Sequence, residues 1–138
     1  MRLLSIGYPM PHRLIDNHTI FNAPTLFDYD AIIVDPGIGF GKSAPSGKSH
    51  GGHNIEILQR LGLFHDLGCP VLLGVSRKSF IDRLAGVDEP KQRLPGSLAA
   101  GLAGLDKGVQ ILRVHDVAET VQALAVWRAL TADLSNDS

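Results

Sequence analysis

The chain has 138 residues, of which 44% are hydrophobic and 20% charged, and its formal net charge is −1. These proportions are typical of a folded globular domain and exclude a disordered tail. The near-neutral charge offers no footprint for nucleic acid or an anionic membrane, and no apolar run reaches the roughly 18 residues that span a bilayer. The single cysteine, Cys69, cannot form an internal disulfide, so we expect a cytoplasmic protein and an inert thiol in the core.

Residues 1–30 contain three prolines and little hydrophobic periodicity, so we leave them unassigned apart from one candidate strand at 2–6. From residue 31 onward the chain repeats one pattern, in which a short apolar run is followed by a polar or glycine-rich loop and then by a helical segment. Runs that are apolar on both faces are typical of buried parallel strands. Three such runs are present, at 31–34, 71–75 and 110–114.

Helical periodicity follows each of these strand ends. It begins at Ile55 in the first segment, which Gly68 closes, and the second segment ends at a Lys107–Gly108 cap signature. The third carries an apolar stripe that includes Trp127, which we expect to be buried. Asp116 precedes it, three residues before a glutamate, and predicts a capping box. The alternation of strand and helix predicts an α/β fold with a parallel sheet over 31–132, followed by a polar tail at 133–138.

Polar side chains stand where each of the three predicted strands ends. Asp35 follows the first strand, Ser76 and Lys78 follow the second, and Arg113 and His115 close the third. Because side chains two residues apart share a face, and because ligands of α/β folds bind beyond the carboxyl ends of parallel strands, we expect these five groups to converge. The competing interpretation is that some of them cap the next helix or pair with one another.

Four of these groups have a chemical use at such an edge. The planar guanidinium of Arg113 suits phosphate oxygens, and His115 donates to the same anion. The carboxylate of Asp35 accepts two parallel N–H bonds from a heterocycle that carries an amino group beside a ring N–H. Lys78 bonds a ring oxygen or nitrogen. The four together predict a pocket for a flat heterocycle and its phosphates.

A glycine-rich loop at 37–42 follows the first strand and permits close approach to a ligand. Its spacing matches neither the dinucleotide fingerprint nor the phosphate loop of ATP-binding proteins, so we exclude ATP binding. Phe40, placed between two glycines, is expected to expose its ring beside a ligand rather than pack in the core. His50 and His53 lack a third ligand and the rigid spacing of a zinc site, so we assign no metal ligand in this chain.

Four blocks of sequence resemble dihydropteroate synthase, an enzyme of folate biosynthesis, and they occur in the order of that family. They are DPGIGFGK at 35–42, GVSRKSF at 74–80, RLPGSLA at 93–99 and RVHDVAET at 113–120. The family is a TIM barrel, and the blocks resemble its last three βα units. Because a closed eight-stranded barrel needs about 200 residues or more, the resemblance implies a partial TIM-barrel-type fold with parallel strands, too short to close.

The resemblance also implies a reaction, in which p-aminobenzoate condenses with 6-hydroxymethyl-7,8-dihydropterin pyrophosphate to give 7,8-dihydropteroate and pyrophosphate. A carbocation-like transition state and assistance by Mg²⁺ are implied as well, although the metal's protein ligand is not found in this chain. By position in the family, the residues fall into groups that hold the pterin, flank the aminobenzoate or grip the pyrophosphate, with Lys78, Arg113 and His115 as catalytic residues. These groups are, in the same order, Asp35, Lys78 and Gly74; Phe40 and Ser76; and Arg113 and His115, with Gly39 as a further substrate-binding residue.

Two departures from the family pattern leave alternatives open. The family's His-Asn pair here comes at 53–54, after an insertion of about seven residues within 43–52, and the family's first five βα units have no counterpart in residues 1–30. One interpretation is a transferase that carries part of its site. The others are a non-catalytic pterin- or phosphate-binding fragment, a subunit completed by another chain, and a related pterin-binding methyltransferase. We expect the chain to form a homo-oligomer or to be completed by another chain. The serine–arginine–lysine and arginine–valine–histidine blocks argue against the methyltransferase.

Overall fold

The computed structural model describes residues 2–5, 32–39 and 50–132. The predictions for Phe40, for most of residues 1–30 and for the tail 133–138 lie outside these ranges. The described elements are β1 (Arg2–Ser5), α1 (His50–Gln59), the 3₁₀ helix η2 (Leu61–Leu67), β2 (Leu72–Leu73), α2 (Ser79–Ala85), the 3₁₀ helix η3 (Pro90–Arg93), α3 (Leu94–Asp106), β3 (Ile111–Val114) and α4 (Val117–Thr131).

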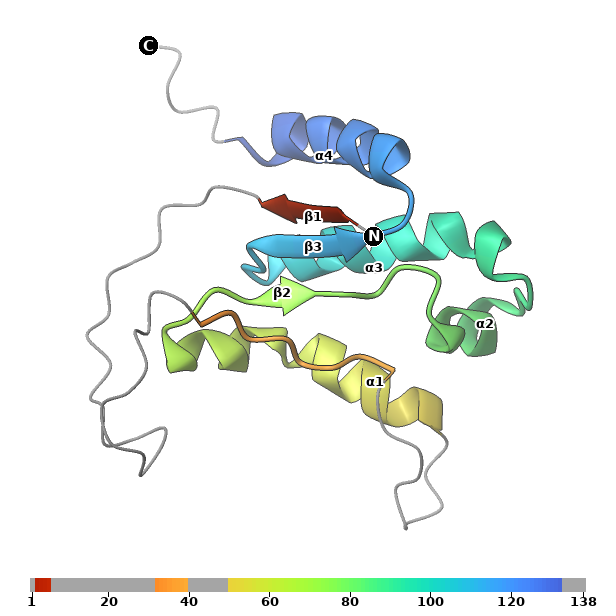
Figure 1. Ribbon diagram of the computed structural model, residues 1–138, viewed down its shortest axis with the longest axis horizontal. Helices are drawn as coiled ribbons and strands as arrows, with labels where there is room; N and C mark the ends of the chain where they lie inside the picture. Colours follow the sequence, from red (N-terminus) through yellow and green to blue (C-terminus); the bar gives the residue numbers. More distant parts are fainter. Residues whose placement is uncertain (1, 6–31, 40–49, 133–138) are drawn as a thin grey trace.

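The three predicted strand segments lie side by side and run in the same direction (Figure 1). β2 pairs with β3 in parallel, with Leu72 opposite Ile111. The segment at 32–39 joins the other side of β2 through a parallel bridge between Val34 and Val71. Its hydrogen bonds are regular, with 2.8 Å from the Leu72 nitrogen to the Val34 oxygen. The expected parallel α/β arrangement is confirmed, although the paired stretches are shorter than the apolar runs.

The candidate strand at the amino terminus forms, but it runs in the opposite direction. β1 pairs with β3 antiparallel, with Arg2 opposite Val114 and Ser5 opposite Ile111, so the described sheet has the order β1-β3-β2. The candidate strand is therefore present, but it does not extend the parallel part of the sheet. The outer N–H and C=O groups of β3 can pair with a strand of either direction, and local apolar composition does not specify which.

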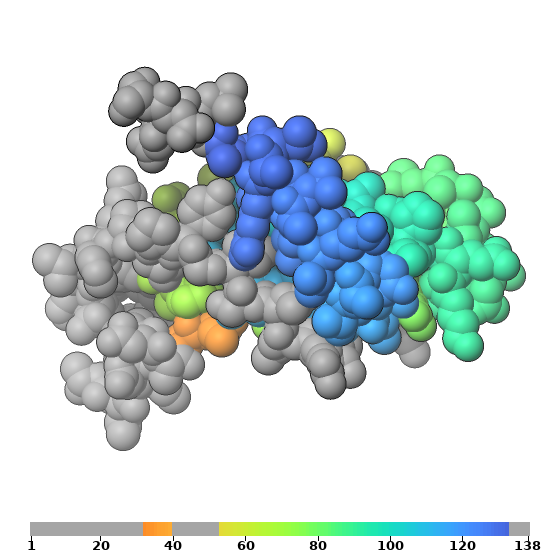
Figure 2. Space-filling model, turned by 90° about the horizontal axis from the view of Figure 1, so that it is seen from above, coloured from red at the N-terminus to blue at the C-terminus, as the bar shows by residue number. Residues whose placement is uncertain are grey.

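β2 is buried on both faces, as is typical of a central parallel strand, whereas β3 alternates between buried and partly exposed residues. Val71, Leu73 and Leu112 are at most 1% exposed and pack against the helices. Figure 1 shows α4 above β1 and β3, α1 below β2, and α3 behind the strands. Seen from above in Figure 2, α4 lies across the molecule beside α3 and α2. Removal of this apolar surface from water contributes about 1.5–3 kcal/mol for each large side chain and holds the strands in register.

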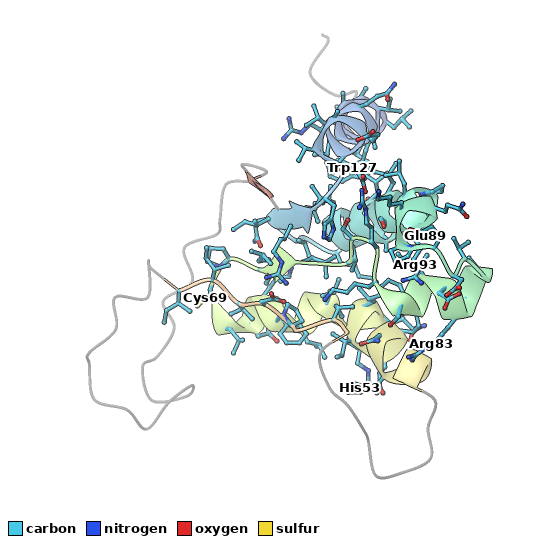
Figure 3. All side chains as sticks on the ribbon, turned by 45° about the vertical axis from the view of Figure 1, so that its right-hand side comes forward. His53, Cys69, Arg83, Glu89, Arg93 and Trp127 are labelled. Carbon is cyan, nitrogen blue, oxygen red and sulfur yellow. The ribbon has the colours of Figure 1, made fainter. Side chains whose placement is uncertain are left out.

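Three single-residue expectations have different outcomes. Cys69 is 6% exposed, which confirms a buried thiol, and Figure 3 labels it at the amino-terminal end of β2. Trp127 is half-buried and ties α4 to α3, because its Nε1 donates to Asp106 Oδ1 over 2.8 Å. The prediction of a capping box at Asp116 was wrong. Asp116 is the N-cap residue of α4, but its carboxylate makes no capping bond because it binds Arg77 instead. In the described part of the chain, no helix is both long and apolar enough to cross a membrane.

Two buried glycines let α3 approach the strands closely. A Cβ at Gly104 would overlap Leu73 Cδ2, a side chain with no exposed surface, whereas a Cβ at Gly101 would meet Leu112 Cδ1 at an ordinary 3.5 Å. Both positions lie in the same helix, so a substitution at either has the same effect on backbone entropy. They differ only in the space available for the added methyl group.

We therefore expect Gly104→Ala to destabilise the protein by about 1–3 kcal/mol, because an added methyl overpacks the core. Gly101→Ala should be neutral or stabilise it by up to about 1 kcal/mol, because alanine is the better helix former. Urea unfolding of both variants measures the difference. Equal losses of stability in both variants would show that the close contact of α3 with β2 is not as described.

Candidate active site

An ion pair joins the ends of two strands that are not neighbours. Arg113 NH2 lies 3.1 Å from Asp35 Oδ2, although β2 lies between the segments that carry these residues. The guanidinium can reach across β2 because Gly74, the residue directly after this strand, has no side chain in its path. A Cβ at that position would lie 2.8 Å from Arg113 NH2. The other oxygen of Asp35 accepts the backbone N–H of Gly37 at 2.9 Å, which fixes the carboxylate at the start of the glycine-rich loop.

Lys78 lies close to this ion pair. Partial burial lowers the pKa of Lys78, the charge of Arg113 lowers it further, and the carboxylate of Asp35 partly offsets both. Because the folded-state pKa is below the usual 10.5, the unfolded chain binds more protons between those two values. The contribution of Lys78 to the free energy of unfolding therefore increases as the pH rises through that window. The charges of Lys78 and Asp35 therefore interact, as the sequence predicts for two residues of one site.

Gly39 forms the wall against which the Lys78 side chain packs. A Cβ there would lie 3.1 Å from Lys78 Cδ, and its φ of +79° is in the left-handed region that glycine favours. The N–H of Gly39 donates to Asn54 Oδ1 at 3.0 Å, and Asn54 is only 8% exposed. The sequence alone indicated no role for Asn54. Its signal was the family's His-Asn pair, which still reaches the glycine-rich loop despite the insertion before it.

Ser76 and His115 connect the loops that follow β2 and β3. The backbone N–H of His115 donates to Ser76 Oγ at 3.2 Å, and His115 Nδ1 lies 3.0 Å from the same oxygen. Ser76 is 6% exposed, whereas the His115 side chain faces solvent. The imidazole is therefore anchored at one nitrogen, and the rest of the ring is exposed.

The structure thus brings together the predicted site residues that it describes, at the carboxyl ends of the strands. They are Asp35, Gly39, Gly74, Ser76, Lys78, Arg113 and His115. The two cations Lys78 and Arg113 outnumber the single carboxylate, and His115 adds a donor. This excess of positive charge and of N–H donors favours an anionic ligand such as a phosphate ester. The carboxylate retains acceptor positions for the N–H groups of a heterocycle.

A metal ion is not accommodated by these residues. Mg²⁺ prefers several oxygen ligands in octahedral geometry. Across residues 2–5, 32–39 and 50–132, no three histidine, cysteine or acidic side chains are grouped so that they could hold a metal. Asp35 supplies the one carboxylate among these residues, and it lies beside the cations Arg113 and Lys78, which would repel a metal ion. These side chains therefore do not form a binding site for Mg²⁺.

Comparison with known proteins connects this geometry to one family. The model of the pterin binding enzymes matches residues 23–115. Among curated proteins, the dihydropteroate synthase of Escherichia coli strain K12 is 42% identical over 107 residues, which cover 78% of this chain and 35% of that protein. The dihydropteroate synthase of Neisseria meningitidis serogroup B is 46% identical over 104 residues, 75% of this chain and 35% of the relative. The chain spans about a third of the length of these relatives.

Solved structures give the same result. Dihydropteroate synthase from Xanthomonas albilineans in complex with 7,8-dihydropteroate aligns with a TM-score of 0.69 and 45% identity, over 77% of this chain and 38% of that one. The enzyme from Thermus thermophilus in complex with 6HMPPP aligns with a TM-score of 0.65 and 48% identity, over 72% and 37% of the two chains. The described elements therefore correspond to part of a larger fold, a TIM barrel that they do not close.

The coupling of charges at the site is open to measurement. Because the carboxylate of Asp35 raises the pKa of Lys78, Asp35→Asn should lower that pKa further. NMR titration of the Lys78 ε-amino group in both proteins measures the change. The titration of Lys91, an exposed side chain on η3, serves as the control and should be the same in both. An unchanged or higher pKa of Lys78 would mean that the two groups do not share a hollow.

Gly74→Ala tests the path of the arginine across β2. The added methyl displaces the flexible end of Arg113 rather than backbone, so we expect the variant to fold with a loss of about 1 kcal/mol or less. The ion pair with Asp35 should nevertheless separate, which a crystal structure of the variant measures as an increased distance between Arg113 NH2 and Asp35 Oδ2. If the pair remains at 3.1 Å, glycine at this position is not what permits it.

Proposed function

The chain belongs to the pterin binding enzyme family, and from this premise we propose that it forms the pterin- and pyrophosphate-binding part of a dihydropteroate synthase. The substrates are dihydropterin pyrophosphate and p-aminobenzoate. The observation that carries the proposal is the cluster at the strand ends, where a carboxylate, a lysine and an arginine meet around two glycines. A flat heterocycle with N–H donors at one end and a diphosphate at the other matches those charges.

We assign each end of the substrate to the groups that complement it. Asp35 accepts the N–H groups at the amino edge of the pterin, and Lys78 bonds a ring oxygen or nitrogen. Arg113 and His115 hold the pyrophosphate oxygens, the arginine through its fork of N–H donors. Ser76 anchors His115 and borders the aminobenzoate. The backbone at Gly74 and Gly39 lines the pterin pocket without side chains that would fill it.

The chemistry follows from these positions. The bond from the methylene carbon of the pterin to the pyrophosphate oxygen breaks, positive charge develops on that carbon, and the amine nitrogen of p-aminobenzoate forms the new bond to it. Negative charge then accumulates on the departing pyrophosphate, while the new secondary amine loses a proton. Fixed donors aimed at developing charge lower the barrier strongly, since they need no reorganisation during the reaction. We assign that role to Arg113 and His115.

A second candidate function rests on the length of the chain. Because it spans about a third of its curated relatives, it supplies only part of their fold. The alternative is therefore a binding fragment without catalysis, or a subunit completed by another chain. The Mg²⁺ expected from the family resemblance and the cytoplasmic location stay predictions, as do oligomerisation and the lack of nucleic-acid or membrane partners.

Calorimetry with dihydropterin pyrophosphate tests the binding assignment. We expect the protein to bind it, and Asp35→Ala to weaken binding by about tenfold or more, since a charged hydrogen bond contributes about 1.5–3 kcal/mol. Asp66→Ala, which removes an exposed carboxylate on η2, is the matched control and should leave binding unchanged. If the two variants bind equally well, or if the unaltered chain does not bind, the pterin assignment is wrong.

A synthesis assay separates the two candidate functions. Formation of dihydropteroate from both substrates with Mg²⁺, lost in Lys78→Ala, would support catalysis by this chain. Binding of the pterin without product would favour the binding fragment or the incomplete subunit.

A further inference from the structure

Arg77 stands between two site residues, Ser76 and Lys78, and has an unusual backbone. Its φ of +59° is the only positive value among the non-glycine residues of the described ranges. Residues other than glycine rarely adopt this backbone conformation unless the surrounding structure enforces it. Here they do, because the Arg77 N–H donates to Ser97 Oγ at 2.8 Å and its carbonyl accepts from Arg93 NH1 at 3.1 Å.

The support beneath Arg77 comes from the start of α3, in the RLPGSLA block that the site itself does not use. Arg93 is 7% exposed, and Figure 3 labels it between α2 and α3. Its guanidinium donates to the carbonyls of Val87, at 2.7 Å, and of Asp88, so it is fixed from several sides. Ser97 Oγ in turn donates to the Arg93 carbonyl at 2.8 Å. This buried arginine and serine hold the backbone of Arg77 rather than any ligand.

The side chain of Arg77 extends this support to the other loop of the site. Its guanidinium forms a two-pronged ion pair with Asp116, with 3.0 Å from Nε to Oδ2 and a second contact from NH2 to Oδ1. Asp116 directly follows His115 in the chain. The hydrogen bonds to Arg77 lower the pKa of the Asp116 carboxyl, so the pair stays ionised at neutral pH. The loop after β2 is thereby tied to the loop after β3.

We propose that Arg77 is a positioning residue, which sets the distance between the Ser76–Lys78 loop and the Arg113–His115 strand end through a brace made of Arg77, Arg93, Ser97 and Asp116. This inference deepens the proposed function and rests on it for the ligand. A diphosphate gripped by His115 and Arg113 and a ring bonded by Lys78 belong to one molecule. The spacing of the two loops therefore decides whether both ends of the substrate are held together, and small misplacements of such groups are costly.

A competing role for Arg77 is direct contact with the phosphate. The two roles predict opposite effects of Asp116→Asn. If Arg77 binds the anion itself, release from Asp116 frees its guanidinium and removes a negative charge, so affinity should rise or stay the same. If Arg77 positions the loops, Asp116→Asn should weaken anion binding as much as loss of the arginine does.

Inorganic pyrophosphate, titrated by calorimetry into the full chain, distinguishes them. Arg77→Asn is the suitable partner variant, because asparagine tolerates a positive φ and the backbone bonds to Ser97 and Arg93 are kept. We expect each single variant to lose about tenfold in affinity and the double variant to lose no more, as for two residues that act through one contact. Arg60→Asn, which breaks the exposed pair with Glu56 on α1, should leave affinity unchanged.

Tighter or unaltered binding in Asp116→Asn, or losses that add in the double variant, would overturn the proposal. If Arg77→Asn does not fold by circular dichroism, Asp116→Asn alone still separates the two roles. A second readout needs no ligand. The imidazole ¹⁵N signals of His115 report its contact with Ser76 Oγ, and they should change in both single variants but not in Arg60→Asn. If the unaltered chain binds no pyrophosphate, the proposed function fails, and these signals alone decide whether the brace positions the loops. Unchanged signals would refute it.

Discussion

The ion pair between Asp35 and Arg113 fixes the geometry on which the rest of the site depends. It connects two strand ends across an intervening strand, and the guanidinium passes over the backbone at Gly74, where any side chain would collide with it. The same guanidinium contributes to the low pKa of Lys78, and the same carboxylate is bonded to the glycine-rich loop. One contact thus gathers the carboxylate, both cations and the loop into a single cluster.

Much of this arrangement follows from strand periodicity. Three apolar runs with polar residues at their ends predict parallel strands, and side chains two residues apart share a face, so Arg113 and His115 meet Ser76 and the carboxylate of Asp35. The opposite faces of these strands are equally regular, since Leu73 and Leu112 alternate with the site residues along the chain and are buried. What periodicity cannot give is the side-chain partner of each group, which depends on the loops between the elements.

The features that the sequence did not reveal depend on long-range contacts. Asp116 has the residue type and the position of a helix cap. Its carboxylate instead binds the guanidinium of Arg77, 39 residues earlier in the chain, which offers two charged hydrogen bonds. Nothing local marks Arg77 for a positive φ, because the bonds that enforce it come from η3 and α3. The direction of β1 is likewise set by pairing with β3 and not by its own residues.

If the strand ends form one binding site for a pterin and its pyrophosphate, a crystal structure of this chain with dihydropterin pyrophosphate will show it. We expect the pterin's amino edge against Asp35, its ring beside Lys78 and the pyrophosphate on Arg113 and His115. A ligand bound elsewhere, or the carboxylate of Asp35 and the ammonium of Lys78 on opposite sides of the molecule, would contradict it.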